Sequence, residues 1–346
     1  MTTPFSSLDD FVALPRLSGL VLDRAGTRLV TSVATLDPKK TAYRTALWEV
    51  DPAGEQPARR LTQGAAGESG AVFLSSGDLL FTSARPDPKD ADGEKRAALW
   101  RLPAAGGEAS LLLTRDGGVA GVATADAADV VVVTANALAG SANEEDDAER
   151  RTVRREAGVA AILHDGYPVR YWDADLGPDE PRYFGLQGLD DDGARSLEDL
   201  APSVRGGLRD AHPVLSPDGS VLFTALTVPE ERGSQRTVLA RVDLATRELT
   251  VLLDDRDSDY SPGPVSPDGR HLAVLKDRRT AVDLAPSTTL LLLPLEGGEP
   301  TPLAADWDRW PSPAAWLPDG SALVVTADDD GAAPVFVIEV ATGMVR

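Results

Sequence analysis

The chain has 346 residues with 34 Lys or Arg against 55 Asp or Glu, which gives a formal net charge of -21. A surface this negative repels phosphate backbones and anionic lipid, so we expect neither nucleic acid nor a membrane surface as a partner. The sequence has no cysteine, which excludes disulfides, thiolate metal sites and a cysteine nucleophile.

The N-terminal segment, residues 1–16, lacks the basic region and the apolar stretch of a secretion signal and instead carries Asp9 and Asp10. No run of apolar residues approaches the roughly 18 that a membrane span requires. We therefore expect a cytoplasmic protein.

From residue 17 to residue 346 the chain repeats with a period of about fifty residues. Three copies of a Pro-Asp-Gly turn, two of them Ser-Pro-Asp-Gly, place Gly219, Gly269 and Gly320 at intervals of 50 and 51 residues. Weaker copies place Gly26 and Gly77 at an interval of 51 residues. A degraded sixth copy lies around residues 125–133, where the turn signal is lost but an apolar strand remains.

Each copy has the chemistry of a β-hairpin. Proline sets φ at the first corner, aspartate suits the second, and glycine takes the positive φ that returns the chain. About twenty residues later most copies show another strand, such as Ala46–Asp51, then a polar turn and a short closing strand, such as Arg60–Thr62. Four short antiparallel strands per period predict the blade of a β-propeller, since a β-sandwich would show no such recurrence.

The predicted fold is therefore an all-β propeller, of which about five and a half blades are present over residues 17–346. The period places its blades at about 17–62, 68–114, from 119, 209–254, 259–304 and from 312. At Arg346 the closing strand of the last blade is only beginning. Because an incomplete blade leaves an unpaired strand edge, and the face with Val335, Val337 and Val340 would lack a neighbour, we expect oligomers or aggregation.

An insertion at about residues 139–208 interrupts the third blade. Residues 143–156 have acids first and bases after, which complements a helix dipole and predicts a helix. Two interpretations stay open for it: a solvated helix or mobile loop, or a flap at the rim of the propeller that contacts a partner domain or substrate.

A dense aromatic cluster follows the predicted helix. Because Trp, Tyr and Arg dominate recognition surfaces, it is a candidate patch for contact with a substrate or a neighbouring domain. The alternative is an aromatic strand that packs the blade, with Arg170 paired to Asp173. The candidate residues are Tyr167, Arg170, Tyr171, Trp172 and Asp173.

The hairpins, the charged insertion and the segment Gly158–Leu163 followed by Tyr167–Gly177 together resemble the N-terminal propeller of prolyl oligopeptidase-family serine peptidases. The similarity is to the acylaminoacyl-peptidase and dipeptidyl-aminopeptidase branch. It implies a propeller of about seven blades before an α/β-hydrolase domain, whose active site faces the central channel. It also implies that the propeller admits peptide substrates and excludes folded proteins.

The sequence departs from that family because it has no hydrolase domain and no Gly-x-Ser-x-Gly nucleophile elbow. The resemblance implies that the catalytic domain would lie downstream, so we assign no catalytic residue to this chain and leave open whether it belongs to an enzyme. His164, His212 and His271 are expected to be structural or on the surface. The alternative function is a free-standing protein-binding propeller of the Tol-system or WD-repeat type.

We expect no metal and no cofactor. The three histidines lack the spacing of zinc ligands. Asp255, Asp257 and Asp259 begin like a calcium loop, but the glycine and the bidentate glutamate that such a loop needs are replaced by Tyr260 and Ser266. The sequence has no phosphate-binding or dinucleotide-binding glycine loop.

Overall fold

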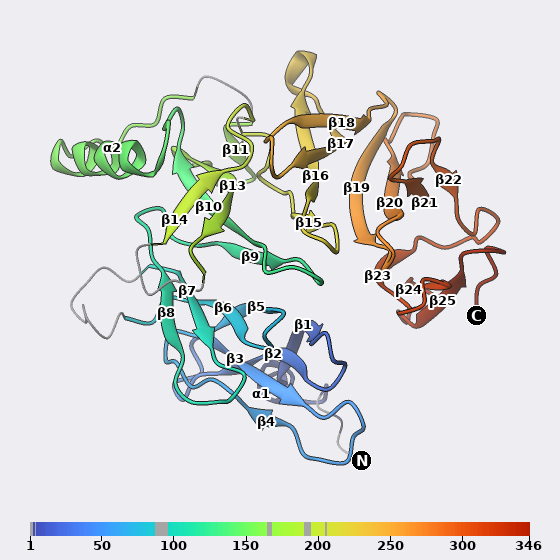
Figure 1. Cartoon of the computed structure of the whole chain (residues 1–346), viewed down its shortest axis with the longest axis horizontal. Coiled ribbons are helices and arrows are strands. Elements are labelled where there is room, and N and C mark those ends of the chain that lie inside the picture. Colours follow the sequence, from blue (N-terminus) through green and yellow to red (C-terminus); the bar gives the residue numbers. More distant parts are fainter. Residues whose placement is uncertain (1–2, 4, 87–95, 165–167, 190–194, 205) are drawn as a thin grey trace. The chain divides into compact units, whose positions relative to one another are not determined.

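A computed structural model describes residues 3, 5–86, 96–164, 168–189, 195–204 and 206–346. The chain divides into two compact units: unit 1 consists of Met1–Val159 and Tyr183–Glu198, and unit 2 of Ala160–Arg182 and Asp199–Arg346. In the described residues six antiparallel blade sheets follow one another along the chain, and a seventh, two-stranded sheet lies outside them (Figure 1). The fold is a six-bladed β-propeller of mostly four-stranded sheets, which confirms the predicted fold class.

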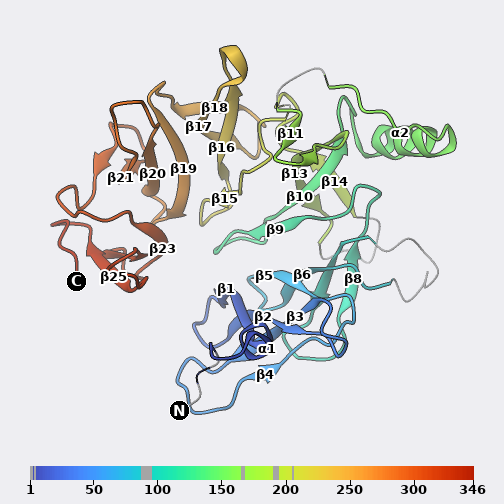
Figure 2. The same cartoon turned by 180° about the vertical axis from the view of Figure 1, so that it is seen from behind.

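Unit 1 begins with the short helix α1 (Leu8–Ala13), capped by the Ser7 side chain. The helix lies beside blade 1 (Figure 2), where the Tyr43 hydroxyl donates to the Val12 carbonyl at 2.5 Å. Blade 1 consists of β1 (Arg16–Leu22), β2 (Leu29–Leu36), β3 (Tyr43–Val50) and β4 (Arg59–Arg60). Blade 2 consists of β5 (Ser69–Phe73), β6 (Leu79–Ser83), β7 (Ala98–Leu102) and β8 (Ser110–Leu113).

Blade 3 is assembled from two separated parts of the chain. Its strands are β9 (Gly121–Thr124), β10 (Val131–Leu138), β13 (Asp179–Gln187) and β14 (Ser196–Asp199). Strands β13 and β14 lie inside the range 139–208, where the sequence indicates only inserted segments. The reason is that β10 and β13 are not joined by a short turn, so no turn signal marks their pairing. Between them lie α2 (Glu144–Glu156) and the hairpin of β11 (Arg170–Tyr171) and β12 (Ala174–Asp175).

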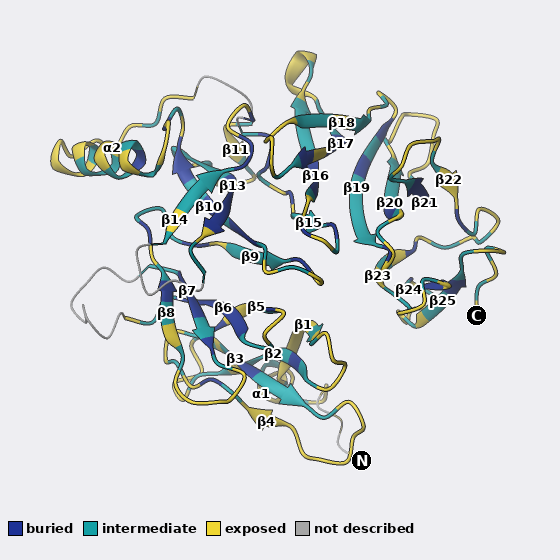
Figure 3. Cartoon of the chain, viewed as in Figure 1, coloured by how far each residue is buried: buried dark blue, intermediate teal, exposed yellow. Residues whose placement is uncertain are grey.

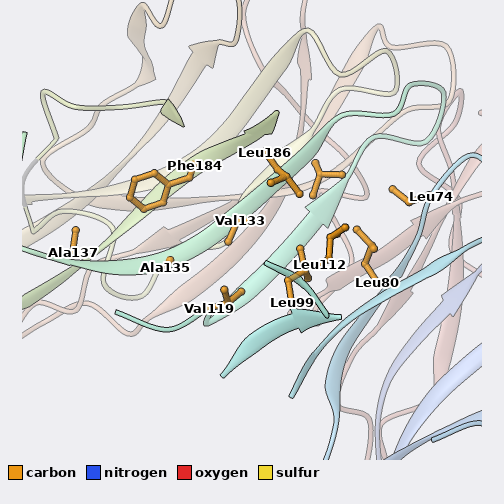
Figure 4. Packing of buried hydrophobic residues seen from close by; sticks show 11 residues of the cluster. Leu74, Leu80, Leu99, Leu112, Val119, Val133, Ala135, Ala137, Phe184 and Leu186 are labelled. Carbon is orange, nitrogen blue, oxygen red and sulfur yellow. The ribbon is translucent and has the colours of Figure 1, made fainter. Parts of the chain in front are cut away.

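The largest core cluster of unit 1 joins blades 2 and 3 (Figure 4). Alternate residues of β10 point to the same face of the sheet, as the period of a strand requires. From that face Val133 and Ala135 meet Leu80 and Leu99 of blade 2 and Phe184 of β13. Burial of each large side chain stabilises the fold by about 1.5–3 kcal/mol relative to an exposed position, so this cluster holds the two blades together.

Unit 2 contains the β11–β12 hairpin and the last three blades. Blade 4 consists of β15 (Val214–Leu215), β16 (Val221–Pro229), β17 (Gln235–Asp243) and β18 (Leu249–Leu253), with the 3-10 turn η1 (Glu231–Gly233) after β16. Blade 5 consists of β19 (Ser258–Val265), β20 (His271–Arg278), β21 (Ser287–Pro294) and β22 (Thr301–Pro302). Blade 6 has three strands, β23 (Ser312–Trp316), β24 (Ala322–Thr326) and β25 (Val335–Glu339).

A fourth segment of blade 6 pairs with β25 through the last residues of the sequence. Val345 forms an antiparallel bridge with Ile338, and the Arg346 N–H donates to the Val337 carbonyl at 3.0 Å. The pairing agrees with the closing strand that the sequence predicts at this point.

The repeated turns have the conformation that their chemistry predicts. Gly219, Gly269 and Gly320 have φ of 71°, 72° and 71°. In the first of these turns the Ser216 hydroxyl donates to the Asp218 carboxylate at 2.6 Å, and the Ser220 N–H donates to the same oxygen at 3.0 Å. Each turn is thus closed by its own side chains as well as by glycine.

Candidate functional site

The candidate patch lies on a separate two-stranded hairpin of unit 2 and outside the blade sheets. In its register Arg170 lies opposite Asp175 and Tyr171 opposite Ala174, and the Leu176 N–H donates to the Val169 carbonyl at 3.0 Å. Trp172 and Asp173 form the two-residue loop between the strands. Tyr167, the remaining candidate, lies outside the described residues. The structure thus brings four of the five candidates together.

Trp172 is the most distinctive residue of this hairpin. Its side chain is 98% exposed, and its φ is 54°, in the left-handed region. The first position of a two-residue hairpin loop usually carries glycine, asparagine or aspartate, which adopt positive φ at little cost. A bulky residue there costs about 1–2 kcal/mol. The hairpin therefore tolerates backbone strain while it presents an indole ring to solvent.

The base of the hairpin is attached to a loop of blade 4. The Tyr171 hydroxyl donates to the Asp210 carboxylate at 3.2 Å, and in the same loop Arg209 donates to the carbonyl of Asp179, the first residue of β13, at 3.2 Å. The loop itself is fixed because Thr227 N–H donates to the Gly207 carbonyl at 2.8 Å. A Cβ at Gly207 would lie 2.5 Å from Leu226 Cδ1, so the loop approaches β16 as closely as glycine permits.

The ion pair of the hairpin differs from the one considered in the sequence. Arg170 Nε lies 3.3 Å from Asp175 Oδ1, and Arg170 Nη2 donates to the backbone carbonyl of Asp173 at 3.2 Å. The side-chain partner is therefore Asp175, because the hairpin register places it opposite Arg170. Both side chains are more than half exposed, and such a pair contributes little to stability.

Further apolar side chains are exposed near the same stretch of sequence. Leu163 is 92% exposed and Val169 is 38% exposed. Figure 3 shows that the blade strands carry most of the buried residues, whereas much of the inserted sequence is exposed. The hairpin therefore does not match the alternative of an aromatic strand buried against the blade.

Helix α2, which the charge pattern predicts, is attached to blade 3 through buried charges. Asp147 is 1% exposed and accepts hydrogen bonds from the Leu138 N–H at 2.6 Å and from Arg115 and Arg151 at 3.2 and 2.8 Å. Arg115 also forms two hydrogen bonds with Glu144, at 2.9 and 2.8 Å. These contacts favour a fixed helix over a mobile loop. No local sequence signal connects Arg115 to the helix.

The remaining polar candidates do not form a reaction centre in the described part of the chain. His164 and His212 are exposed, and His271 is half-buried on β20. Among the described residues no three His, Asp or Glu side chains gather as metal ligands would. The Asp255 carboxylate instead accepts the Asp257 N–H and binds Lys276, and these two contacts, in that order, lower the pKa of Asp255.

No helix of the described residues is both long enough and apolar enough to cross a bilayer.

Comparison with known proteins identifies the fold. No family model matches the sequence, and no curated protein matches it. Acylaminoacyl peptidase from Pyrococcus horikoshii matches with a TM-score of 0.67 and 10% identity, over 97% of this chain and 46% of that chain. Acylaminoacyl peptidase in complex with Z-Gly-Gly-Phe-chloromethyl ketone gives the same values.

Solved structures of other proteins match as well. The propeller domain of the Trilobed protease from Pyrococcus furiosus has a TM-score of 0.59 and 8% identity, over 96% of this chain and 82% of that one. Oligogalacturonate lyase in complex with manganese has a TM-score of 0.60 and 14% identity, over 94% and 74%. At these identities the likeness shows the fold alone. This chain is a β-propeller structurally like that of acylaminoacyl peptidase, and it spans less than half of that peptidase's length.

Proposed function

We propose that this chain is the substrate-selecting propeller of a serine peptidase related to the acylaminoacyl peptidases. The observation that carries the proposal is the match of 97% of this chain to 46% of the acylaminoacyl peptidase chain. The distinctive segment Gly158–Gly177 supports it from the sequence, and in the structure that segment includes the exposed β11–β12 hairpin.

In this proposal recognition and chemistry belong to different parts of the protein. Acyl transfer by a serine requires a nucleophile elbow and a histidine within hydrogen-bond reach of it. The sequence has no Gly-x-Ser-x-Gly, and each of its histidines lies on a blade, a loop or the insertion rather than beside such a serine. The peptide substrates would therefore be cleaved by an α/β-hydrolase domain in the same polypeptide or in a tightly bound one, and the chain alone is expected to show no turnover.

The test is to label the protein as it occurs in its source cells. An affinity tag is placed at the chromosomal locus, the native protein is purified, and it is treated with a biotinylated fluorophosphonate that reacts with activated serines. We expect a labelled serine hydrolase in the tagged polypeptide or in stoichiometric complex with it. A heat-denatured sample is the control, because it should lose the labelling. Fractionation of the same cells tests the cytoplasmic location, which stays a prediction.

If the tagged protein runs as the free 36.4-kDa chain and no labelled hydrolase accompanies it, the peptidase assignment is wrong. That result would favour the free-standing protein-binding propeller. If labelling is found, cleavage of a short acylated peptide is compared with cleavage of a folded protein that contains the same sequence. Selection by the propeller predicts cleavage of the short peptide only.

A further inference from the structure

We propose that the β11–β12 hairpin, Val169–Leu176, is a docking site for a cationic peptide segment. An Arg or Lys side chain of that segment stacks on Trp172, and neighbouring aspartates balance its charge. This names the class of peptide that the proposed peptidase would select. Only the description of the bound peptide as a substrate rests on the proposed function.

The first argument is the placement of Trp172. The chain has six tryptophans; Trp100 is 1% exposed in the core, whereas Trp172 is 98% exposed on a hairpin loop. Its φ of 54° would suit glycine better, so neither burial nor backbone conformation accounts for an indole at this position. Strained residues of this kind cluster where a ligand is held, and an exposed aromatic ring offers a large contact area with few rotatable bonds.

The second argument is the charge around the ring. Asp173 lies beside Trp172 in the loop, the Asp175 side chain is 71% exposed, and Asp210 binds the Tyr171 hydroxyl at the base. The bases are Arg170, which pairs with Asp175, and Arg209 of the blade 4 loop, so three carboxylates stand against two bases. Carboxylates therefore outnumber cations at this site, as they do in the whole chain, with its net charge of -21.

An exposed aromatic ring on a hairpin with more carboxylates than bases fits a cation. A guanidinium or ammonium group over the face of tryptophan is attracted by the ring quadrupole, and tryptophan is the best ring for this interaction. Arginine adds a planar group that stacks on the ring while its N–H groups donate to a carboxylate. The attachment of the hairpin to the loop of blade 4 through Tyr171 lowers the entropy that binding would cost.

The experiment measures binding to the purified chain by fluorescence anisotropy. Three labelled hexapeptides are compared, which differ only in a central arginine, citrulline or glutamate; citrulline keeps the shape of arginine without its charge. Trp172→Gly removes the ring and also the strain, so the hairpin is expected to fold. Trp310→Ala is the matched control, since Trp310 is 58% exposed in unit 2 but lies on another loop. Asp173→Asn removes one carboxylate.

We expect the arginine peptide to bind at least about fivefold more tightly than the citrulline peptide, and the glutamate peptide to bind more weakly still. Trp172→Gly should abolish this preference and Asp173→Asn should reduce it, whereas Trp310→Ala should leave it intact. Added salt should weaken the binding of the arginine peptide, because the attraction is partly ionic.

The proposal is overturned if the arginine peptide does not bind, if citrulline binds equally well, or if Trp172→Gly binds as the original chain does. Equal losses in Trp172→Gly and Trp310→Ala would also overturn it. These outcomes are independent of the fluorophosphonate test. If the arginine peptide binds but no hydrolase is labelled, the hairpin is the binding site of a free-standing propeller. If a hydrolase is labelled but the arginine peptide does not bind, the peptidase assignment stands and the preference for cationic peptides is wrong.

Discussion

Substitution of Asp147 by asparagine tests whether buried charges hold helix α2 on blade 3. The carboxylate is 2% exposed and accepts hydrogen bonds from Leu138, Ser141, Arg115 and Arg151. An asparagine side chain of the same size has one oxygen and one NH2 group. In either orientation of the amide, its NH2 group faces another donor: the Leu138 N–H in one, and the guanidinium groups in the other.

The expected cost follows from the loss of a buried ionic partner. Removal of one member of a buried pair typically destabilises a protein by 3–5 kcal/mol, and asparagine keeps part of the hydrogen bonding, so we expect about 3 kcal/mol. For a unit of this size that corresponds to a fall in Tm of about 6–12 °C. Because Asp147 is the helix residue that accepts from Leu138 of β10 and from Arg115 of the loop after β8, hydrogen exchange in α2 should accelerate as well.

The measurement is thermal unfolding followed by circular dichroism, with hydrogen exchange resolved to peptides of α2 and β10. Glu149→Gln is the control, since it removes a charge from an exposed position of the same helix and should leave Tm unchanged. If Asp147→Asn unfolds within about 0.5 kcal/mol of the original chain and α2 stays protected, the helix is held by other contacts and the reasoning is wrong.

Three further predictions concern other elements. Gly207→Ala forces a Cβ to within 2.5 Å of the Leu226 side chain and should destabilise unit 2 by about 1–3 kcal/mol in thermal unfolding; no change would mean that the loop is free to move. The Ser266 hydroxyl and then the Arg270 N–H lower the pKa of Asp268. The ionised carboxylate therefore stabilises the fold above about pH 4, and this contribution is lost as the pH falls through the lowered pKa. Urea midpoints of the original chain and of Asp268→Asn should thus differ at pH 6, and the difference should shrink as the pH falls below about 4; a constant difference would contradict the assignment. Val335 is 64% exposed on β25, and we expect light scattering to show oligomers or aggregates that increase with concentration; a stable monomer at all concentrations would refute this.

The repeat made the blades predictable, because a Ser-Pro-Asp-Gly turn is local chemistry. Gly219 and Gly269 have the positive φ that the sequence requires, and strands flank each of them. Strand β13 had no such signal, since its partner β10 lies on the other side of the insertion. Its sequence, Asp179–Gln187, begins with charged residues, and only the tertiary fold buries the half that follows.

The sequence was sufficient to predict which residues form the candidate patch, but not their exposure or their contacts. The aromatic composition indicated Trp172 as a candidate. Its exposure depends on the hairpin loop, and the neighbouring residues in the sequence do not predict it. The ion-pair partner of Arg170 depends on the register of the hairpin. The register places Asp175 opposite Arg170, two residues after the Asp173 that the sequence suggested. The contact of Arg115 with Asp147 joins residues far apart in the sequence, which a single sequence without covariation does not reveal.

The split of blade 3 also affects the order in which a growing chain can fold. The other blades close within one contiguous stretch, as blade 5 does between Ser258 and Pro302, but β10 ends at Leu138 and its partner β13 begins at Asp179. At typical rates of synthesis the intervening residues, about 40 of them, take roughly 2–8 s to emerge. During this time the apolar strand β10 has an unpaired edge on the side where β13 will bind. The acidic residues Glu144–Asp147 follow directly and carry repulsive charge beside that edge. The start of the insertion would thus protect the nascent chain from association with its neighbours until the blade is complete.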